Sequence, residues 1–151
     1  MEMKPIGVVH TPYMSVENIP LCASEKLEAV AVVEVFPDYV EGLRDVEGFS
    51  HLMLVVHMHE ATGTMLTVHP PIDDEGKARG VFATRSPMRP NHIGVSIVEL
   101  DRVEGHNLFV RGIDLLDGTP LIDIKPYMPY DVRTVIKVGW LEGKAISQDD
   151  G

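Results

Sequence analysis

Residues 26–36, KLEAVAVVEVF, place an apolar side chain at every second position. The opposite face of this segment includes Lys26, Glu28 and Glu34. A period of two is typical of a β-strand that buries one of its faces, and it differs from the period of a helix. The segment therefore predicts a half-buried strand with these inward residues: Leu27, Ala29, Ala31, Val33 and Val35.

Most of the remaining chain has a similar character. Residues 50–59 contain the run LMLVV, which is too short and too rich in β-branched residues to favour a helix. Only residues 37–47 look helical. Turn signals occur at Gly105 and at Asp117-Gly118-Thr119. The other expected strands are residues 80–85, 95–103, 107–116 and 120–124.

Short strands, frequent turns and almost no helix predict an all-β fold, in which an antiparallel sheet closes into a small barrel or folds into a sandwich. A chain of 151 residues is ordinarily one domain. We expect the barrel domain over residues 1–138 and a tail over residues 139–151. Apolar side chains near the tail, including Trp140, would pack on the barrel or on a second subunit.

Composition excludes several classes of protein. No apolar run approaches the ~20 residues that span a bilayer, so we expect no membrane partner. The N-terminus lacks the basic and apolar segments of a secretion signal, which favours a cytoplasmic location. The single cysteine, Cys22, excludes an intramolecular disulfide and a cysteine-rich zinc site.

A basic island interrupts an acidic chain. Residues 76–94 contain Lys77, Arg79, Arg85 and Arg89 and no acidic residue. The whole chain has a net charge of −10, so the remainder carries nine basic against twenty-three acidic residues, or −14. Clustered guanidinium groups suit a carboxylate or phosphate ligand. The alternative is a surface loop that neighbouring carboxylates neutralise.

The most specific part of this island is the loop over residues 84–91, TRSPMRPN. Pro87 and Pro90 restrict its backbone and the residues that precede them. Arg85 and Arg89 on such a stiff loop lose less entropy when they bind an anion. A structural turn with incidental charges is the alternative.

A second polar stretch surrounds the turn at residues 114–120. Asp114 and Asp117 could bind hydroxyl or ammonium groups of a ligand, or could simply form the hairpin turn. Asp123 and Lys125 share one face of the next strand, as a structural ion pair or as part of a site.

Other common motifs are absent or weak. No two glycines are closer than four positions apart, which excludes the G-x-G turn of dinucleotide-binding and doubly wound folds. His57 and His59 lie on one face of a strand, and Glu60 and His69 could complete a metal-ligand set. Their spacing fits such a set poorly, so we expect no metal, and we keep a metal-dependent barrel enzyme as the least favoured alternative.

Two long motifs resemble the TrmO family, which are tRNA methyltransferases that use S-adenosylmethionine. The motifs are GVFATRSPMRPNHIG at residues 80–94 and DGTPLIDIKPY at residues 117–127. Supporting matches are IGV at residues 6–8, TPY at 11–13 and GFSHL at 48–52. The resemblance implies a single small β-barrel that forms a homodimer. It also implies methylation of the exocyclic nitrogen of threonylcarbamoyladenosine, beside the anticodon in the tRNA anticodon loop.

The resemblance also implies site residues. The expected S-adenosylmethionine-binding residues are Leu21, Cys22, Ala23, His59, Glu60, Arg85, Asp114, Leu115, Leu116, Asp117 and Thr119. The expected substrate-binding residues are Lys77, Arg79, Arg89, Asn91, Lys125 and Tyr127. No catalytic base is identified.

This chain departs from the family pattern in two places. It has Pro20-Leu21-Cys22-Ala23 where longer members have Pro-Arg-Gln, and it stops at Gly151 where longer members continue. Two alternatives therefore stay open beside tRNA methylation. One is methylation of another small nucleoside or metabolite, and the other is S-adenosylmethionine binding without catalysis.

Overall fold

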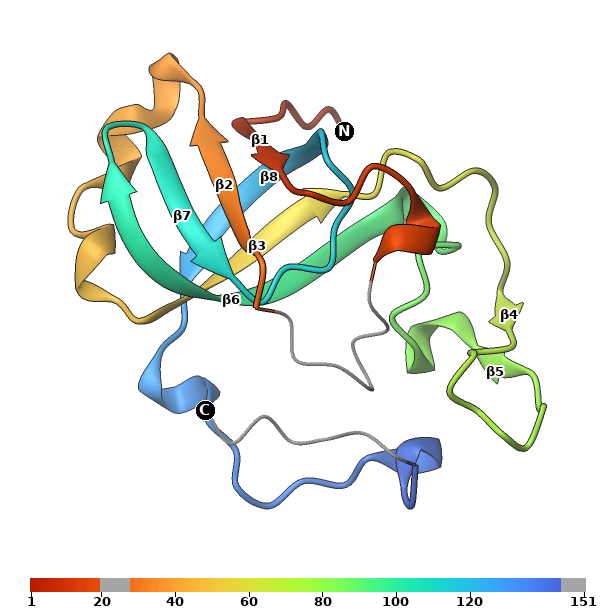
Figure 1. The fold of residues 1–151 in the computed structure, drawn as a ribbon. Coiled ribbons are helices and arrows are strands. Elements are labelled where there is room, and N and C mark those ends of the chain that lie inside the picture. The colour runs from red at the N-terminus through yellow and green to blue at the C-terminus, as the bar shows by residue number, and fades with distance from the viewer. Residues whose placement is uncertain (20–27, 145–151) are drawn as a thin grey trace.

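The computed structural model describes residues 1–19 and 28–144. Six antiparallel strands form a closed barrel in the order β1-β2-β7-β6-β3-β8 (Figure 1), which confirms the predicted barrel. Full closure removes the unpaired edges that an open sheet would expose. The strands are β1 (Gly7–His10), β2 (Val30–Val35), β3 (His51–His57), β6 (Ile93–Glu104), β7 (Asn107–Arg111) and β8 (Thr119–Pro126).

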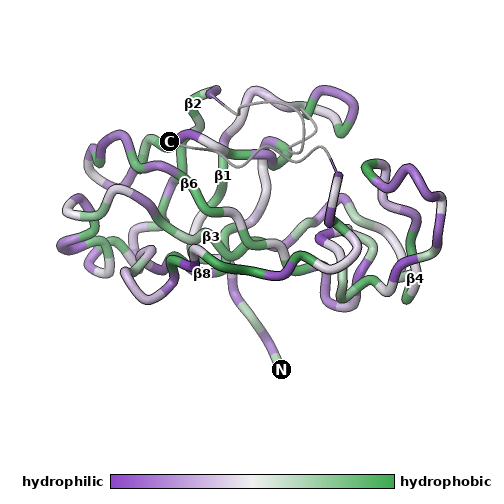
Figure 2. Tube along the Cα trace, turned by 90° about the horizontal axis from the view of Figure 1, so that it is seen from below, coloured by the Kyte–Doolittle hydropathy of each residue, from purple (hydrophilic) through white to green (hydrophobic). Residues whose placement is uncertain are grey.

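The inward positions of the strands form the hydrophobic core. In β2, Ala31, Val33 and Val35 are at most 1% exposed, as the alternation predicted. Complete burial of a Val or Leu side chain stabilises the folded state by about 1.5–3 kcal/mol. In Figure 2 much of β3 and β6 is coloured as hydrophobic. The other strand residues of the core are Val9, Leu52, Leu54, Val56, Val98, Leu108, Val110 and Leu121.

Closure of so small a barrel requires bent strands and close backbone contacts. The register of β6 with β7 shifts between Leu100 and Arg102, and the register of β3 with β8 shifts next to Val55. Such bulges bend and twist a strand. A Cβ atom at Gly7 would lie 2.1 Å from the carbonyl oxygen of Glu34, so glycine is required where β1 meets β2.

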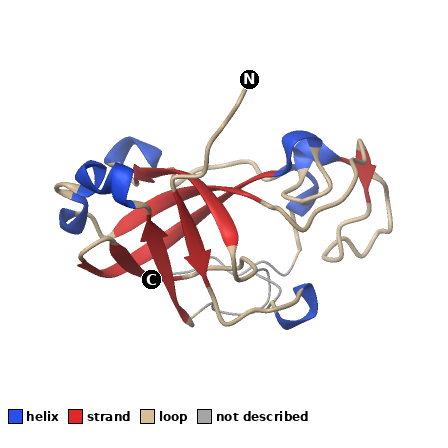
Figure 3. Ribbon diagram, turned by 90° about the horizontal axis from the view of Figure 1, so that it is seen from above, coloured by secondary structure: helices blue, strands red, loops and turns tan. Residues whose placement is uncertain are grey.

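The helices of the described residues are all short 3₁₀ turns, and most of them lie at the ends of the barrel (Figure 3). The helical segment predicted at residues 37–47 is present, but Asp45, at φ 72°, separates η2 from η3. No helix in the described part of the chain is long and apolar enough to cross a membrane. The helices outside residues 58–92 are η1 (Val16–Asn18), η2 (Pro37–Leu43), η3 (Val46–Gly48), η6 (Pro129–Asp131) and η7 (Gly139–Leu141).

Residues 58–92, here called the excursion, leave the barrel between the paired strands β3 and β6. They form a lobe beside the barrel in Figure 1. The excursion contains a two-stranded sheet of β4 (Thr67–Val68) and β5 (Arg79–Gly80). Two 3₁₀ turns follow, η4 (Val81–Ala83) and η5 (Pro90–His92).

Two predicted strands are corrected by the structure. The strand expected at residues 80–85 is wrong, because only Gly80 pairs and the Thr84 hydroxyl donates a 2.8 Å hydrogen bond to the Val81 carbonyl, which stabilises a turn. The strand expected at residues 107–116 ends at Arg111. Gly112 then adopts φ 91°, and the pairing of β7 with its neighbours ends at Arg111.

Candidate active site

One end of the barrel collects most of the predicted site residues. In an antiparallel barrel, the end of one strand lies beside the start of its neighbours, so the strand pairings define two rims. We call one of them the site rim. It is formed by His10, Val30, His57, Ile93, Arg111 and Thr119.

Asp114 lies on the site rim in the connection from β7 to β8. Its buried neighbours Ile113 and Leu115 anchor this connection in the core. The hydroxyl of Ser96 donates a 3.3 Å hydrogen bond to Asp114 Oδ1. One carboxylate oxygen is thus held by the barrel, which fixes the side chain and leaves the second oxygen for a ligand hydroxyl or ammonium group.

Asp117 and Thr119 form the turn that ends this connection. Asp117 Oδ1 accepts a 3.0 Å hydrogen bond from the Thr11 backbone N–H, and Thr119 Oγ1 donates a 2.6 Å bond to the Leu116 carbonyl. Thr119 is only 2% exposed. These contacts agree with the plain turn chemistry that the sequence left open. Asp117 remains partly exposed, with His10 Nδ1 3.9 Å away.

The loop over residues 84–92 enters β6 on the same rim and is held by its own hydrogen bonds. The Ser86 N–H donates to Thr84 Oγ1 at 3.2 Å, and the Met88 N–H donates to Ser86 Oγ at 3.2 Å. Arg89 Nη1 donates to the carbonyl of Thr84 at 2.8 Å. Asn91 adopts a left-handed conformation at φ 64°. The predicted rigidity of this loop thus has a contact-level explanation, and Arg89 is one of its structural parts.

Arg85 is the cation of this loop that stays available. Its side chain is exposed and forms no ion pair or hydrogen bond with any described residue. A guanidinium group carries five donors, so Arg85 can bind a carboxylate or phosphate through two parallel bonds. The loop therefore presents a free cation on a stiff backbone.

His59 and Glu60 follow β3 on the same rim, at the neck of the excursion. Their side chains approach each other, with 3.3 Å between His59 Nε2 and Glu60 Oε1. The Met58 N–H donates to the His92 carbonyl at 2.8 Å and closes the neck. Among residues 1–19 and 28–144, no group of three or more histidine and acidic side chains converges as a metal site would require.

Lys77 and Arg79 have other partners. Arg79 Nε lies 2.7 Å from Asp73 Oδ2, and Lys77 Nζ lies 3.0 Å from Glu75 Oε2. The hydrogen bond from Arg79 lowers the pKa of Asp73 from 3.8 to about 2. This half of the basic island matches the alternative in which neighbouring carboxylates neutralise the charges.

Lys125 and Tyr127 do not join the others. Both lie at the end of β8, on the rim opposite the site rim. Lys125 pairs with Asp123 at 3.2 Å, and both side chains are largely exposed. The Tyr127 N–H donates to the His51 carbonyl at 3.1 Å. The predicted pairing of Asp123 with Lys125 is therefore confirmed.

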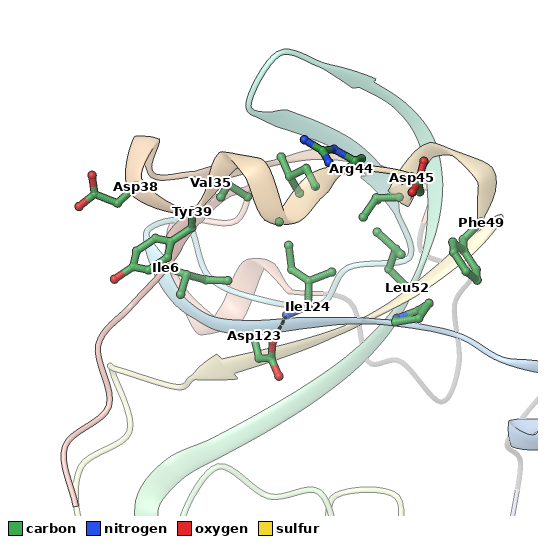
Figure 4. A pocket seen from close by; sticks show the side chains of 14 residues that line it. Ile6, Val35, Asp38, Tyr39, Arg44, Asp45, Phe49, Leu52, Asp123 and Ile124 are labelled. Atoms are coloured by element: carbon green, nitrogen blue, oxygen red, sulfur yellow. Dashed lines mark hydrogen bonds between the residues drawn. The ribbon is translucent and has the colours of Figure 1, made fainter.

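A cleft of about 570 Å³ opens at this opposite rim, beneath η2 (Figure 4). Tyr39 and Phe49 stand on two sides of it, with Ile124 and Leu52 between them. Asp123, named above as a possible ion-pair or site residue, lines this cleft. The cleft thus lies apart from Arg85 and Asp114.

The site residues predicted from the sequence differ from those seen in the structure in two respects. Leu21, Cys22 and Ala23 lie outside the described residues. Ser96 was missed, although its signal is visible in the sequence: it is a hydroxyl at a buried position in the apolar first half of β6. Thr11, whose hydroxyl donates to the Leu115 carbonyl at 2.9 Å, was noticed only through the family motif.

The sequence is similar to the sequences of two relatives. A "probable S-adenosyl-L-methionine-binding protein" of Pyrococcus abyssi is 48% identical over 92% of this chain and 75% of its own length. The "tRNA (adenine(37)-N6)-methyltransferase" of Escherichia coli is 37% identical over 85% of this chain and 58% of its own length. This chain therefore spans less than two thirds of that enzyme.

A solved structure agrees with the sequence comparison. A crystal structure of TrmO from Pseudomonas aeruginosa superposes with a TM-score of 0.78 at 36% identity, over 98% of this chain and 65% of the solved chain. The model of the tRNA-methyltransferase O N-terminal domain matches residues 8–131. That match covers all of the barrel strands except the first residue of β1, and this protein belongs to the TrmO family.

Proposed function

We propose that this protein is an S-adenosylmethionine-dependent methyltransferase that modifies an exocyclic adenine nitrogen in tRNA. The observation that carries the proposal is Arg85, a guanidinium group with no described partner, on a loop that enters β6 at the same rim as the carboxylate of Asp114. Family membership and the names of the relatives support the same cofactor.

The residues of the site rim fit the chemical groups of this cofactor. S-adenosylmethionine supplies an electrophilic methyl group on a sulfonium. Its methionine carboxylate suits the Arg85 guanidinium, and its ammonium or ribose hydroxyl groups suit the second oxygen of Asp114. The protein then has to align the accepting nitrogen in line with the methyl group and to supply a base for the released proton.

The finer substrate that we propose is threonylcarbamoyladenosine in the anticodon loop. Its threonyl carboxylate and the adjacent phosphates are anions that a basic loop could hold. The strong negative balance elsewhere in the chain favours a small RNA contact over a wide one.

We also propose that the protein acts as a homodimer. Val95 and Ile97 expose apolar side chains on the outer face of β6, and Val135 is 93% exposed. A second copy would cover such surface. Light scattering should give a mass near twice 16.7 kDa at micromolar concentration, and a monomer would contradict the proposal.

A second candidate function is cofactor binding without catalysis. The Pyrococcus relative, at 48% identity, is named only for S-adenosylmethionine binding. Methylation of another small nucleoside is a third possibility within the same chemistry.

The decisive experiment combines binding with turnover. Calorimetry with S-adenosylmethionine tests the cofactor, and mass spectrometry of nucleosides from tRNA incubated with protein and cofactor tests the reaction. A methylated threonylcarbamoyladenosine supports the full proposal. Binding without any methylated nucleoside supports the binding protein instead, and absence of binding overturns both.

A further inference from the structure

The segment over residues 139–144 crosses the excursion and contacts it through two side chains. Trp140 Nε1 donates a 2.8 Å hydrogen bond to the carbonyl of Ala83. Lys144 Nζ lies 2.5 Å from Asp74 Oδ1 and 3.4 Å from Asp73 Oδ1. We call this set of contacts the clasp.

Part of the clasp is shielded from water, although Asp74, which pairs with Lys144, is 83% exposed. The side chain of Lys144 is 8% exposed and that of Asp73 is 1% exposed. The guanidinium group of Arg79, which binds Asp73, also lies 5.2 Å from the Trp140 ring centre, within the range of a cation–π contact. The tail and β5 are therefore packed together.

The charged residues in and next to the clasp neutralise one another. The carboxylates are Asp73, Asp74 and Glu75, and the cations are Lys77, Arg79 and Lys144. Each carboxylate has a cation within 3.5 Å, so no net charge is left to attract an ion. The cluster is suited to holding two segments together and unsuited to binding a charged ligand.

The clasp acts at the base of the loop that carries Arg85. Ala83, which accepts the Trp140 bond, is two residues before Arg85. The next residue, Thr84, receives the Ser86 N–H on its hydroxyl and the Arg89 guanidinium on its carbonyl. A displacement of Ala83 would therefore pass directly into the hydrogen bonds that shape this loop.

We propose that Trp140 and Lys144 are positioning residues, which hold the loop over residues 84–89 so that Arg85 meets its anionic ligand. This inference rests on the proposed function. Neither residue forms a hydrogen bond or ion pair with Arg85 or Asp114, so their effect passes through the loop.

The test substitutes Lys144→Gln, which removes the cation, and Trp140→Phe, which removes the N–H donor and keeps an aromatic ring over Arg79. The matched control is Lys137→Gln. Lys137 lies two residues before this segment, is exposed and forms no ion pair or hydrogen bond with any described residue. Lys144→Arg keeps a cation at this position and should therefore behave largely like the wild type.

The first measurement is amide hydrogen exchange at Ser86 and Met88, whose N–H groups hold the loop. Exchange at both should quicken in Lys144→Gln and in Trp140→Phe, and it should stay unchanged in Lys137→Gln. This measurement does not depend on activity. Unchanged exchange in both clasp variants would overturn the inference even if the protein is a methyltransferase.

The second measurement separates the inference from the proposed function. In Lys144→Gln the Kd for S-adenosylmethionine should rise roughly tenfold, because small misplacements of a binding group are costly. The thermal midpoint of the barrel should move little. Wild-type affinity in a variant whose loop exchange has quickened would overturn the positioning role. Absence of binding by the wild type would contradict the proposed function, and the exchange result would still decide the role of the clasp.

Discussion

The two halves of the basic island differ in what surrounds them, although they are neighbours in the sequence. On the excursion, Arg79 and Lys77 face carboxylates at 2.7 and 3.0 Å. Six residues later, Arg85 projects from a loop that contains no acidic residue and meets no described partner. A charged residue is available to a ligand only where the fold supplies no counter-ion, and the order of residues alone does not reveal this.

Arg85→Ala should give the largest effect on ligand binding. Loss of a charge-assisted contact to a carboxylate weakens affinity by about 1.5–3 kcal/mol, or roughly 10- to 100-fold. Calorimetry with S-adenosylmethionine measures it. The urea midpoint should barely change, because exposed substitutions usually alter stability by less than about 0.5 kcal/mol.

The matched substitution Arg79→Gln should behave in the opposite way. It leaves the Asp73 carboxylate, only 1% exposed, without its main partner, so the urea midpoint should fall clearly. The two halves of the basic island would not differ as described if Arg79→Gln had the urea midpoint of the wild type. The same would follow if Arg85→Ala had the wild-type affinity for S-adenosylmethionine.

Asn91→Ala tests the rigidity of the loop that carries Arg85. Asn91 lies at φ 64°, where asparagine and glycine are tolerated better than residues with a plain Cβ. Alanine should cost about 1–2 kcal/mol in unfolding free energy, as measured in urea. Asn91→Gly is the control and should remain close to the wild type. Equal losses in both variants would show that the amide side chain matters more than the backbone.

A fall in pH should loosen the contacts of Lys77 and Arg79, the half of the basic island that carboxylates neutralise, before it affects the half that carries Arg85. Because the pKa of Asp73 is lowered from 3.8 to about 2, its stabilising effect is complete above 3.8 and is lost as the pH falls toward 2. Trp140, the only tryptophan in the chain, lies in the clasp and reports its opening by fluorescence. Asp73→Asn should flatten the fluorescence change over that range. An unchanged titration in Asp73→Asn would assign the transition to other groups.

Lys77→Ala should give the smallest effect. The pair with Glu75 is exposed on both sides, so its loss should change stability by about 0–1 kcal/mol. If Lys77 contacts one tRNA phosphate, the slope of log affinity against log salt should fall by about one unit between about 50 and 200 mM salt. An unchanged slope would remove Lys77 from the proposed RNA contact.

The strands were predictable where burial leaves a period in the sequence. In β2 the alternation identified Ala31, Val33 and Val35 as inward residues, and all three are buried. The apolar stretch around Phe82 also resembled a strand, yet Phe82 is exposed and lies in a 3₁₀ turn. The hydroxyl bond of Thr84 outweighs local strand propensity there.

The site was predictable only in part, for a related reason. The stiffness of the loop that carries Arg85 follows from its prolines and is visible locally. The partners of Lys144 lie about 70 residues earlier in the chain, and such a pairing leaves no local pattern. The same holds for Ser96 in β6 and Asp114 in the connection from β7 to β8, which are 18 residues apart.

The closed neck of the excursion has an evolutionary consequence. His57 and Ile93 are paired in the sheet, so the barrel ladder continues past the excursion without a break. The entropy of closing a loop grows only slowly with its length, and a longer or shorter lobe at this point would leave the barrel intact. The clasp, however, ties the lobe to residues 139–144. A lobe that lacked Ala83 or Asp74 at these positions would leave Trp140 and Lys144 without their partners, so the lobe and the tail are coupled in this fold.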